Sequence, residues 1–399
     1  MAAIEERTLL DGGQTAEDVG AGLIAWLGEA RQSLDVALYD VWLPGAVGDA
    51  VADVIRSAAA RGVALRIAYN VDGDRASKPF PAPPRTEPSL LEALGVPLKA
   101  IPGDPDLMHH KFAVRDGTAV WAGSTNWTLD SWTREENVLL TVASEGIARA
   151  YARDFDDLWR RGRVEGSGSF DVSAVEVGGV PVRAWFSPGR GPELSHRIAA
   201  RIGAAQRRVR IASPVLTAAP VLAALNQALS EGVVDVAGVC DATQIGQVFG
   251  QWRTNEHSAW KAPLLARVLS GLPWAGKVST PYAPGAVHDY MHAKVTVADD
   301  VVFIGSFNLS RSGEAAPPAK PVVAENVLEI SEPGLAERMA AFVDAIRLRY
   351  PPVTVPSYAA TDTSPCRCKR TAAGLASPTW WTARSAAPPA AGPGARRRA

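Results

Sequence analysis

Cysteine is scarce in this sequence of 399 residues, which contains three, at positions 240, 366 and 368. Three cysteines cannot build the disulfide framework that stabilises small secreted domains. The Cys366-Arg367-Cys368 group lacks the further Cys or His ligands that a structural zinc site requires. We therefore expect a reducing, cytoplasmic setting and no structural metal.

Long apolar runs are also absent, since no stretch approaches the ~18 continuous apolar residues of a membrane-spanning helix. Glu5 and Glu6 precede any apolar stretch, whereas a secretory signal peptide has a basic start and an apolar middle. Apolar residues make up 47% of the chain and charged residues 21%, as in ordinary globular proteins. The composition predicts a globular chain without a membrane span.

Charge of one sign is not in excess either, because 41 Lys and Arg face 42 Asp and Glu. On net charge alone, this balance excludes a strongly basic nucleic-acid-binding protein. Residues 361–399, however, carry seven basic residues and one acid among many Ala, Pro, Gly, Ser and Thr. We therefore predict a disordered basic tail over residues 353–399. Its basic end could contact nucleic acid or anionic lipid, although a solvated tail without a partner is the simpler interpretation.

Two parts of the chain show the same order of expected helices and strands. Helix, strand, helix and strand are predicted at residues 19–30, 34–39, 47–60 and 63–69, and again at 194–204, 209–212, 219–229 and 234–240. Each part also ends with a strand and a helix, at 137–142 and 147–159 and at 326–330 and 335–350. This alternation predicts an α/β fold with mixed sheets flanked by helices. We expect a first repeat over 1–165, a linker over 166–180 and a second repeat over 181–352.

Each repeat contains a matching group of polar residues. The order is His-x-Lys, four residues, Asp, and then Gly-Ser-x-Asn. The two sets are His109, Lys111, Asp116, Ser124 and Asn126, and His292, Lys294, Asp299, Ser306 and Asn308. Histidine occurs only six times in the chain, so two such groups at nearly equal spacing are not an accident.

Strand alternation predicts that each group lies on one face of a β-hairpin. His109 and Lys111 share a face, whereas His110 points to the apolar face. Asp116-Gly117 is typical of a two-residue turn, which would pair Arg115 with Thr118 and place His109 opposite Ser124. The second group is one residue shorter, so we expect a three-residue loop over 298–300 that keeps His292 opposite Ser306.

These residue types suit the chemistry of phosphate esters. Lysine and asparagine can hold the non-bridging oxygens of a phosphodiester, so Lys111, Lys294, Asn126 and Asn308 are candidate catalytic residues. Histidine can act as a nucleophile or as a general acid near neutral pH. Two histidines facing one phosphate permit double displacement through a phosphohistidine. The lysines supply the positive charge, so no metal or cofactor is required.

Other candidates have supporting roles. A histidine needs a partner on its second ring nitrogen, and Glu136 and Glu325 stand at matching places after the two hairpins. We expect Glu136 to orient His109 and Glu325 to orient His292. Asp116 and Asp299 are expected to be structural because they sit in turns. The candidate substrate-binding residues are Ser124, Ser306 and Trp127, although core packing explains Trp127 equally well.

The paired motifs resemble those of the phospholipase D superfamily, over roughly residues 13–350. The resemblance implies a duplicated, pseudo-twofold fold with one active site between the halves. It also implies that His109 is the nucleophile and that His292 serves as acid and base. The sequence departs from the family pattern in its shorter second motif and in an insertion over residues 315–322, which we expect to form a surface loop over the site. The insertion makes Glu325 a less secure match than Glu136.

The substrate stays open at this point. A phospholipid headgroup ester, hydrolysed or transferred to another alcohol at a membrane surface, is favoured because residues 1–360 have an acidic balance. A nuclease acting on DNA or RNA is the alternative. It is supported by the tail and by arginines at positions 160, 161, 163, 207, 208 and 210. A third reading is a nucleic-acid or membrane adaptor that binds phosphate without turnover.

Overall fold

The computed structural model describes residues 3–71, 88–254, 256–280, 287–310, 313 and 321–356. All of them belong to one compact unit, Met1–Asp362. The predicted disordered tail begins too early, because Val353 and Val355 pack against the core of the second half and Val353 N donates to Trp274 O at 3.0 Å. Residues 357–399 of that tail, and residues 315–320 of the surface loop expected over 315–322, lie outside the described residues.

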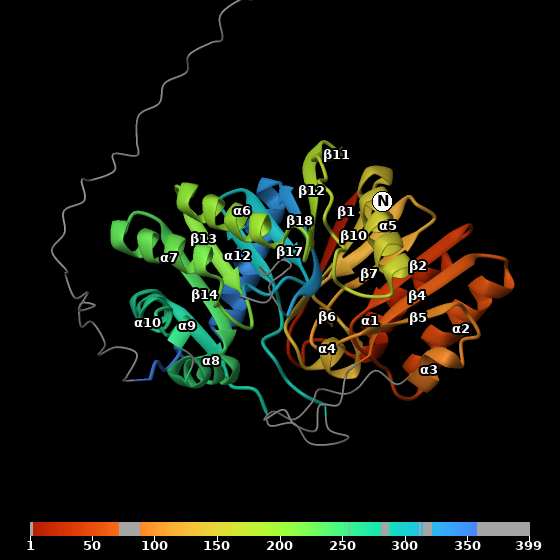
Figure 1. Cartoon of the computed structure of the whole chain (residues 1–399), viewed down its shortest axis with the longest axis horizontal. Helices are drawn as coiled ribbons and strands as arrows, with labels where there is room; N and C mark the ends of the chain where they lie inside the picture. Colours follow the sequence, from red (N-terminus) through yellow and green to blue (C-terminus); the bar gives the residue numbers. More distant parts are fainter. Residues whose placement is uncertain are drawn as a thin grey trace, which may run out of the picture. The chain divides into compact units, whose positions relative to one another are not determined.

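The first half of the chain forms a seven-stranded sheet (Figure 1). Its strands in spatial order are β5 (Leu98–Pro102), β4 (Ala64–Val71), β2 (Ser33–Leu38), β7 (Lys111–Arg115), β8 (Ala119–Gly123), β10 (Asn137–Ala143) and β1 (Ile4–Leu9). The β5-β4-β2 pairs are parallel and the remaining pairs are antiparallel.

The second half repeats these seven strands in the same order and adds β11 at one edge. The spatial order is β15 (Trp274–Lys277), β14 (Asp235–Asp241), β13 (Arg208–Ala212), β16 (Val295–Ala298), β17 (Val301–Gly305), β18 (Val323–Ser331), β12 (Val180–Ser187) and β11 (Val175–Val177). Each pair has the same direction as its counterpart in the first sheet. The duplicated α/β fold with mixed sheets is thus confirmed. The predicted linker 166–180 includes β11, which extends the second sheet.

Three short strands complete the fold. β6 (Leu107–Met108) pairs with β18, and β3 (Val41–Trp42) pairs with β9 (Trp127–Thr128).

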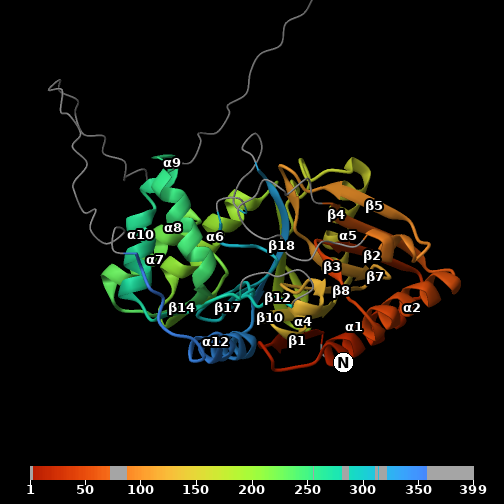
Figure 2. The same cartoon turned by 90° about the horizontal axis from the view of Figure 1, so that it is seen from below.

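Helices cover both faces of each sheet (Figures 1 and 2). α1 (Ala16–Gly28) and α2 (Ala46–Ala60) pack on one face of the first sheet, and α5 (Glu145–Arg161) packs on the other. In the second sheet, α6 (Gly191–Ala204), α7 (Ala219–Glu231) and α10 (Ala262–Gly271) cover one face and α12 (Pro333–Arg347) the other. The shorter helices are α3 (Pro88–Glu92), α4 (Leu129–Thr133), α8 (Ala242–Thr254) and α9 (Glu256–Ala259).

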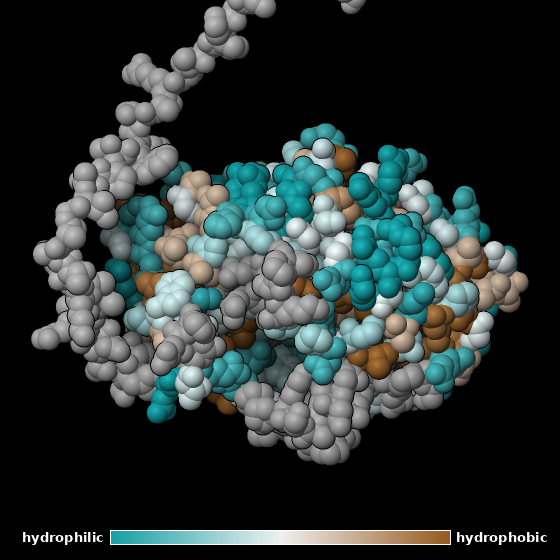
Figure 3. Space-filling view, viewed as in Figure 1, coloured by the Kyte–Doolittle hydropathy of each residue, from teal (hydrophilic) through white to brown (hydrophobic). Residues whose placement is uncertain are grey.

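Helix α5 shows how local sequence sets these elements. Ser144 caps its first turn, and Gly162 ends it in the left-handed conformation with φ 63°. Ile147, Tyr151 and Phe155 recur every four residues and form a buried face. Figure 3 shows hydrophilic side chains gathered over this helix on its outer side. Its inner face joins a core that contains residues of both sheets, so the halves share one interior.

The hairpin registers differ from the predicted ones by one residue in both halves. Arg115 pairs with Ala119, which leaves a three-residue loop, and Ala298 pairs with Val301, which leaves two residues. In the first hairpin, Asp116 adopts φ 54° and Thr118 N donates to Arg115 O at 3.0 Å, as in the expected turn, but Thr118 itself drops out of the ladder. The one-residue difference between the motifs is therefore absorbed in the first loop, the reverse of the expectation.

Candidate active site

Both motifs meet at one cavity of about 170 Å³ between the two halves. The predicted residues His109 and Asn126 line it from the first half, and His292, Lys294 and Asn308 line it from the second. The remaining lining residues are Tyr39, Asp40, Thr128, Asp130, Glu135, Pro214, Gln244 and Tyr290. The location between the halves is the one that the resemblance of the paired motifs implies.

Pairing across the halves brings the histidines together. Met108 of β6 pairs with Ala324 of β18, and His109 N donates to Ala324 O at 2.9 Å. Symmetrically, Met291 forms an isolated bridge with Glu136, just before β10. The residue before each motif histidine therefore pairs with the opposite half, at or next to the last strand of that half's sheet.

The predicted orienting pairs were wrong, because each histidine is oriented from the other half. His109 Nδ1 lies 3.1 Å from Glu325 Oε1. His292 Nδ1 lies 3.1 Å from Glu135 Oε2 and 3.0 Å from Asn137 Oδ1. Glu136 takes no part, since its carboxylate accepts hydrogen bonds from Lys277 Nζ at 3.0 Å and from the Tyr350 hydroxyl.

Strand register explains why sequence matching chose the wrong glutamate. The glycine of each Gly-Ser-x-Asn group lies opposite Leu139 in β10 and Val327 in β18. Asn137 lies two residues before Leu139, and Glu325 lies two residues before Val327. The structural counterpart of Glu325 is therefore Asn137 and not Glu136. The Glu135-Glu136 run was the available signal for a second candidate. Which of two adjacent side chains faces a site depends on register, which the sequence does not show.

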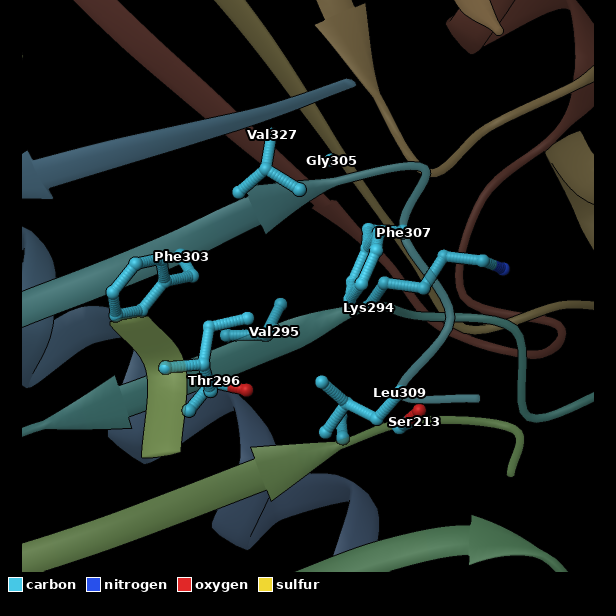
Figure 4. A pocket seen from close by; sticks show the side chains of 11 residues that line it. Ser213, Lys294, Val295, Thr296, Phe303, Gly305, Phe307, Leu309 and Val327 are labelled. Atoms are coloured by element: carbon cyan, nitrogen blue, oxygen red, sulfur yellow. The ribbon is translucent and has the colours of Figure 1, made fainter. Parts of the chain in front are cut away.

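The lysines hold equivalent positions beside the histidines. Lys111 Nζ donates to His109 O at 2.8 Å, and Lys294 Nζ donates to His292 O at 2.6 Å. Figure 4 shows the Lys294 stem running past Phe307, with its nitrogen directed away from the apolar side chains around Val295. Each half thus presents a histidine and a lysine in the same arrangement.

Three predicted substrate-binding residues lie away from the cavity. Ser124 Oγ donates to Asn137 Oδ1 at 2.7 Å, and Ser306 Oγ accepts from Asn326 N at 3.0 Å. Both serines are fully buried against the adjoining strand, because the one-residue change in register turns them from the expected face. Trp127 is in the hydrophobic core between the first sheet and its outer helices. The substrate-binding assignment was therefore wrong for all three.

The predicted structural residues occupy structural positions. The Asp116 carboxylate accepts from the backbone N–H groups of residues 31, 32 and 33 at 2.7 to 3.1 Å. Asp299 accepts from residues 206, 207 and 208 at 2.8 to 3.1 Å. His110 is buried in the core as expected, with Nε2 3.0 Å from Asp154 Oδ2.

Burial sets the charges of the cavity. It lowers the pKa of His109 and of His292 well below the ordinary value, and the nearby lysine charges lower it further. Burial also lowers the pKa of Lys294 to about 7 and raises the pKa of Glu325 to about 8. Burial, and then Asp130, raise the pKa of Glu135 to about 8. Burial and the lysine charges thus favour neutral imidazoles, and the negative charge of a bound phosphate would favour protonated lysines.

A family model described as "Cardiolipin synthase, PLD-like domain" matches residues 23–159 and 198–346, one segment in each half. The chain belongs to the phospholipase D superfamily. Each matched segment carries one His-x-Lys group and the Asn that follows it.

Curated relatives match a shorter part of the chain. The mitochondrial cardiolipin hydrolase of Xenopus tropicalis is 32% identical over 139 residues, 35% of this chain and 60% of that protein. The human mitochondrial cardiolipin hydrolase is 32% identical over 133 residues, 33% of this chain and 47% of that protein. The alignments thus span about half the length of these relatives.

Solved structures share the fold over most of the chain. Phosphatidylserine synthase of Haemophilus influenzae superposes with a TM-score of 0.59 at 13% identity, covering 87% of this chain and 86% of that one. Polyphosphate kinase of Porphyromonas gingivalis gives 0.52 at 13% identity, covering 86% and 50%. At these identities the likeness concerns the fold alone.

Among the residues that the structure describes, no group of three or more His, Cys, Asp or Glu side chains is placed to hold a metal ion. None of the helices in that part of the chain combines the length and apolar character needed to span a bilayer.

Proposed function

We propose that this protein is a phospholipase D-type phosphodiesterase that hydrolyses the headgroup ester of phospholipids through a phosphohistidine. The observation that carries the proposal is the pair of motif histidines on one cavity, each with Nδ1 against a glutamate of the opposite half. Family membership and relatives named as cardiolipin hydrolases support a phospholipid substrate.

In the first step, Nε2 of neutral His109 attacks phosphorus and the bond to the headgroup oxygen breaks. His292, protonated in the presence of the phosphate charge, gives its proton to the departing alcohol. The Glu325 carboxylate accepts a hydrogen bond from the Nδ1–H of His109 and stabilises the positive charge that develops on the ring. Lys111, Lys294 and the motif asparagines stabilise the phosphoryl oxygens.

In the second step, His292 takes a proton from water as the water oxygen attacks phosphorus. The P–N bond to His109 breaks, which releases phosphatidic acid and restores neutral His109. Another alcohol in place of water would give phosphatidyl transfer by the same route.

The arginines at positions 207, 208 and 210 give the nuclease alternative little support, because each of them pairs with an acidic residue. Arg207 pairs with Asp300 at 2.6 Å, and Arg208 pairs with Glu337 at 2.6 Å. Arg210 contacts Asp235 at 2.5 Å and Asp344 at 3.0 Å. These acids neutralise the cations that a polyanion would need.

A substrate panel in the presence of EDTA tests the proposal. Purified protein is assayed with phosphatidylcholine, phosphatidylglycerol, single-stranded DNA and bis(p-nitrophenyl) phosphate. We expect cleavage of lipid and of the chromogenic diester, and a loss of roughly 10³-fold or more in His109→Ala. His196→Ala, at an exposed position on α6, is the control and keeps full activity. Quenched reactions should carry acid-labile phosphate on His109.

Cleavage of DNA without cleavage of lipid would replace the proposal by the nuclease alternative. Activity that survives in His109→Ala would overturn the mechanism.

A further inference from the structure

A buried lysine outside both motifs lies where the two halves meet. Lys277, the last residue of β15, is 2% exposed. Its Nζ donates to the backbone carbonyl oxygens of Arg134 at 2.9 Å and of Tyr290 at 3.2 Å. Arg134 precedes Glu135 in the first half, and Tyr290 lies two residues before His292 in the second. One ammonium group therefore joins the segments that carry the Glu135 and His292 side chains.

Two carboxylates neutralise this buried cation. The third hydrogen bond of Lys277 Nζ goes to Glu136 Oε2 at 3.0 Å, and Asp11 Oδ2 lies 3.1 Å from the same nitrogen. Glu136 is fully buried, and an ammonium group in such surroundings is costly unless it is paired and hydrogen-bonded. The three donors of the ammonium group are all used within the protein. Lys277 is thus placed to hold protein groups and not a ligand.

The first half shows that the sheet itself does not require a lysine at this position. Asn70 pairs with Ile101 between β4 and β5, as Asp241 pairs with Lys277 between β14 and β15. Asn70 and Asp241 are equivalent, since each accepts a hydrogen bond from the backbone N–H of the methionine before the motif histidine, at 3.1 and 3.4 Å. The counterpart of Lys277 is therefore Ile101, which is buried in the core. The buried cation distinguishes the second half from the first.

The backbone pairing between the halves is also weaker beside the second motif. Beside the first motif, β6 and β18 form a ladder with N-to-O distances of 2.9 and 3.0 Å. Beside the second, the pairing in the described residues is an isolated bridge between Glu136 and Met291, with Glu136 N 3.4 Å from Tyr290 O. The hydrogen bonds of Lys277 reach both sides of this bridge and strengthen it.

We propose that Lys277 is a positioning residue that holds Glu135 against His292 and so maintains the second motif histidine as acid and base. The inference rests on the proposed phosphodiesterase function and adds a residue to its mechanism. Glu135 Oε2 lies 3.1 Å from His292 Nδ1, and Lys277 fixes the backbone on both sides of that contact. Without Lys277 the imidazole loses its fixed direction, and a displacement of about 1 Å at a catalytic group can cost roughly 10²-fold in rate.

The proposal separates the two chemical steps on bis(p-nitrophenyl) phosphate. The first step needs little help from an acid, because p-nitrophenolate leaves without a proton, whereas the second needs His292 as the base toward water. His109 has its own partner, Glu325, beside the other ladder. Lys277→Met should therefore leave the first release of p-nitrophenol within a few-fold of wild type and lower steady-state turnover roughly 10- to 100-fold.

Stopped-flow and steady-state measurements of p-nitrophenol release test this separation. Lys277→Met should give a fast burst close to one p-nitrophenol per protein and then slow turnover, with phosphate retained on His109 after quenching. A purely structural defect lowers the burst and the turnover in equal proportion, and that result would overturn the inference. Lys99→Met is the control, because it removes a lysine from the edge strand β5 and should keep both wild-type rates.

A second measurement needs no substrate. The Nδ1–H of His292, hydrogen-bonded to Glu135, should give a downfield signal in proton NMR spectra of protein with isotope-labelled histidine. We expect Lys277→Met to shift or broaden this signal and to leave the corresponding signal of His109 unchanged. An unchanged His292 signal contradicts the inference.

The outcomes distinguish this inference from the proposed function. If the wild-type protein does not cleave bis(p-nitrophenyl) phosphate, both fail. If it does and Lys277→Met turns over at the same rate, the inference alone fails. Should Lys277→Met not fold, its combination with Glu136→Gln also removes the carboxylate left unpaired, and the same burst and turnover decide the outcome. Glu136→Gln alone is the reference for that pair, since its amide oxygen still accepts from Lys277.

Discussion

The two motif histidines are each oriented by a glutamate from the opposite half of the chain. Glu325 reaches His109 and Glu135 reaches His292, each at 3.1 Å, although sequence distance favours other partners. Glu135 and Glu325 are buried beside two lysines, so burial and charge act on all four groups together. Small changes at these residues should therefore act on catalysis rather than on folding.

The contact of each histidine with a glutamate of the opposite half predicts which carboxyl groups matter for turnover. Glu325→Gln and Glu135→Gln should each lower kcat roughly 10²- to 10⁴-fold, because the imidazole loses the group that stabilises its charged form. Glu136→Gln should leave kcat within a few-fold of wild type, since it faces Lys277 and Tyr350. Steady-state kinetics on bis(p-nitrophenyl) phosphate provide the measurement. A larger kcat loss in Glu136→Gln than in Glu135→Gln would restore the assignment made from sequence.

The lowered pKa of Lys294 predicts an alkaline limit of activity. With a pKa of about 7, Lys294 carries its proton below that pH and loses it above, so its attraction for phosphate weakens as the pH rises. The kcat/KM should fall through this range, because this parameter reports ionisations of the free enzyme. In Lys294→Arg the guanidinium stays charged, and the alkaline limit should move upward by at least one pH unit. A profile unchanged by the substitution would assign the limit to another group.

At the scale of elements, the motif aspartate in the loop of each hairpin holds that hairpin to a neighbouring strand. Asp116 and Asp299 have positive φ values and each accepts hydrogen bonds from three successive backbone N–H groups. Each thereby joins its hairpin to the start of a central strand of the same sheet. The motif aspartates thus fix the hairpin that presents the histidine and lysine, without touching the cavity.

Asp299 should therefore affect stability and not chemistry. Asp299→Ala removes three hydrogen bonds to a carboxylate and should lower the free energy of unfolding by about 2 to 4 kcal/mol. Asp300→Ala, one residue further on, removes an exposed ion pair with Arg207 and should change it by less than about 1 kcal/mol. Urea unfolding followed by circular dichroism compares them. Equal effects of the two substitutions would contradict the proposed role of the loop.

At the scale of the whole described unit, the two halves share one interior. The central core contains residues from both sheets, and Tyr151 of α5 donates to Asn326 Oδ1 of β18 at 3.1 Å. Strand pairing also crosses between the halves at Met108 and Met291. A repeat of this kind cannot lose one half without exposing the core of the other.

This shared core predicts one cooperative unfolding transition for both halves. Differential scanning calorimetry should give a single peak whose van't Hoff and calorimetric enthalpies agree, provided that unfolding is reversible. Phe186→Ala, which removes an aromatic ring from the central core, should shift the whole transition downward. Two separated peaks, with only one of them shifted, would show that the halves unfold independently.

The amino-acid sequence was enough to predict the duplication, the order of helices and strands, and the two groups of His, Lys and Asn. Those features rest on periodicity and motif spacing, which are local. The prediction of the turn at Asp116 was correct, but the predicted strand pairing was shifted by one residue. The sequence alone does not show where an added loop residue leaves the strand pairing. Which glutamate contacts which histidine, and that the motif serines lie away from the cavity, became clear only from the folded arrangement of the strands. These contacts come from strands that pair across the two halves, and their register is fixed by packing over distances that sequence spacing does not report.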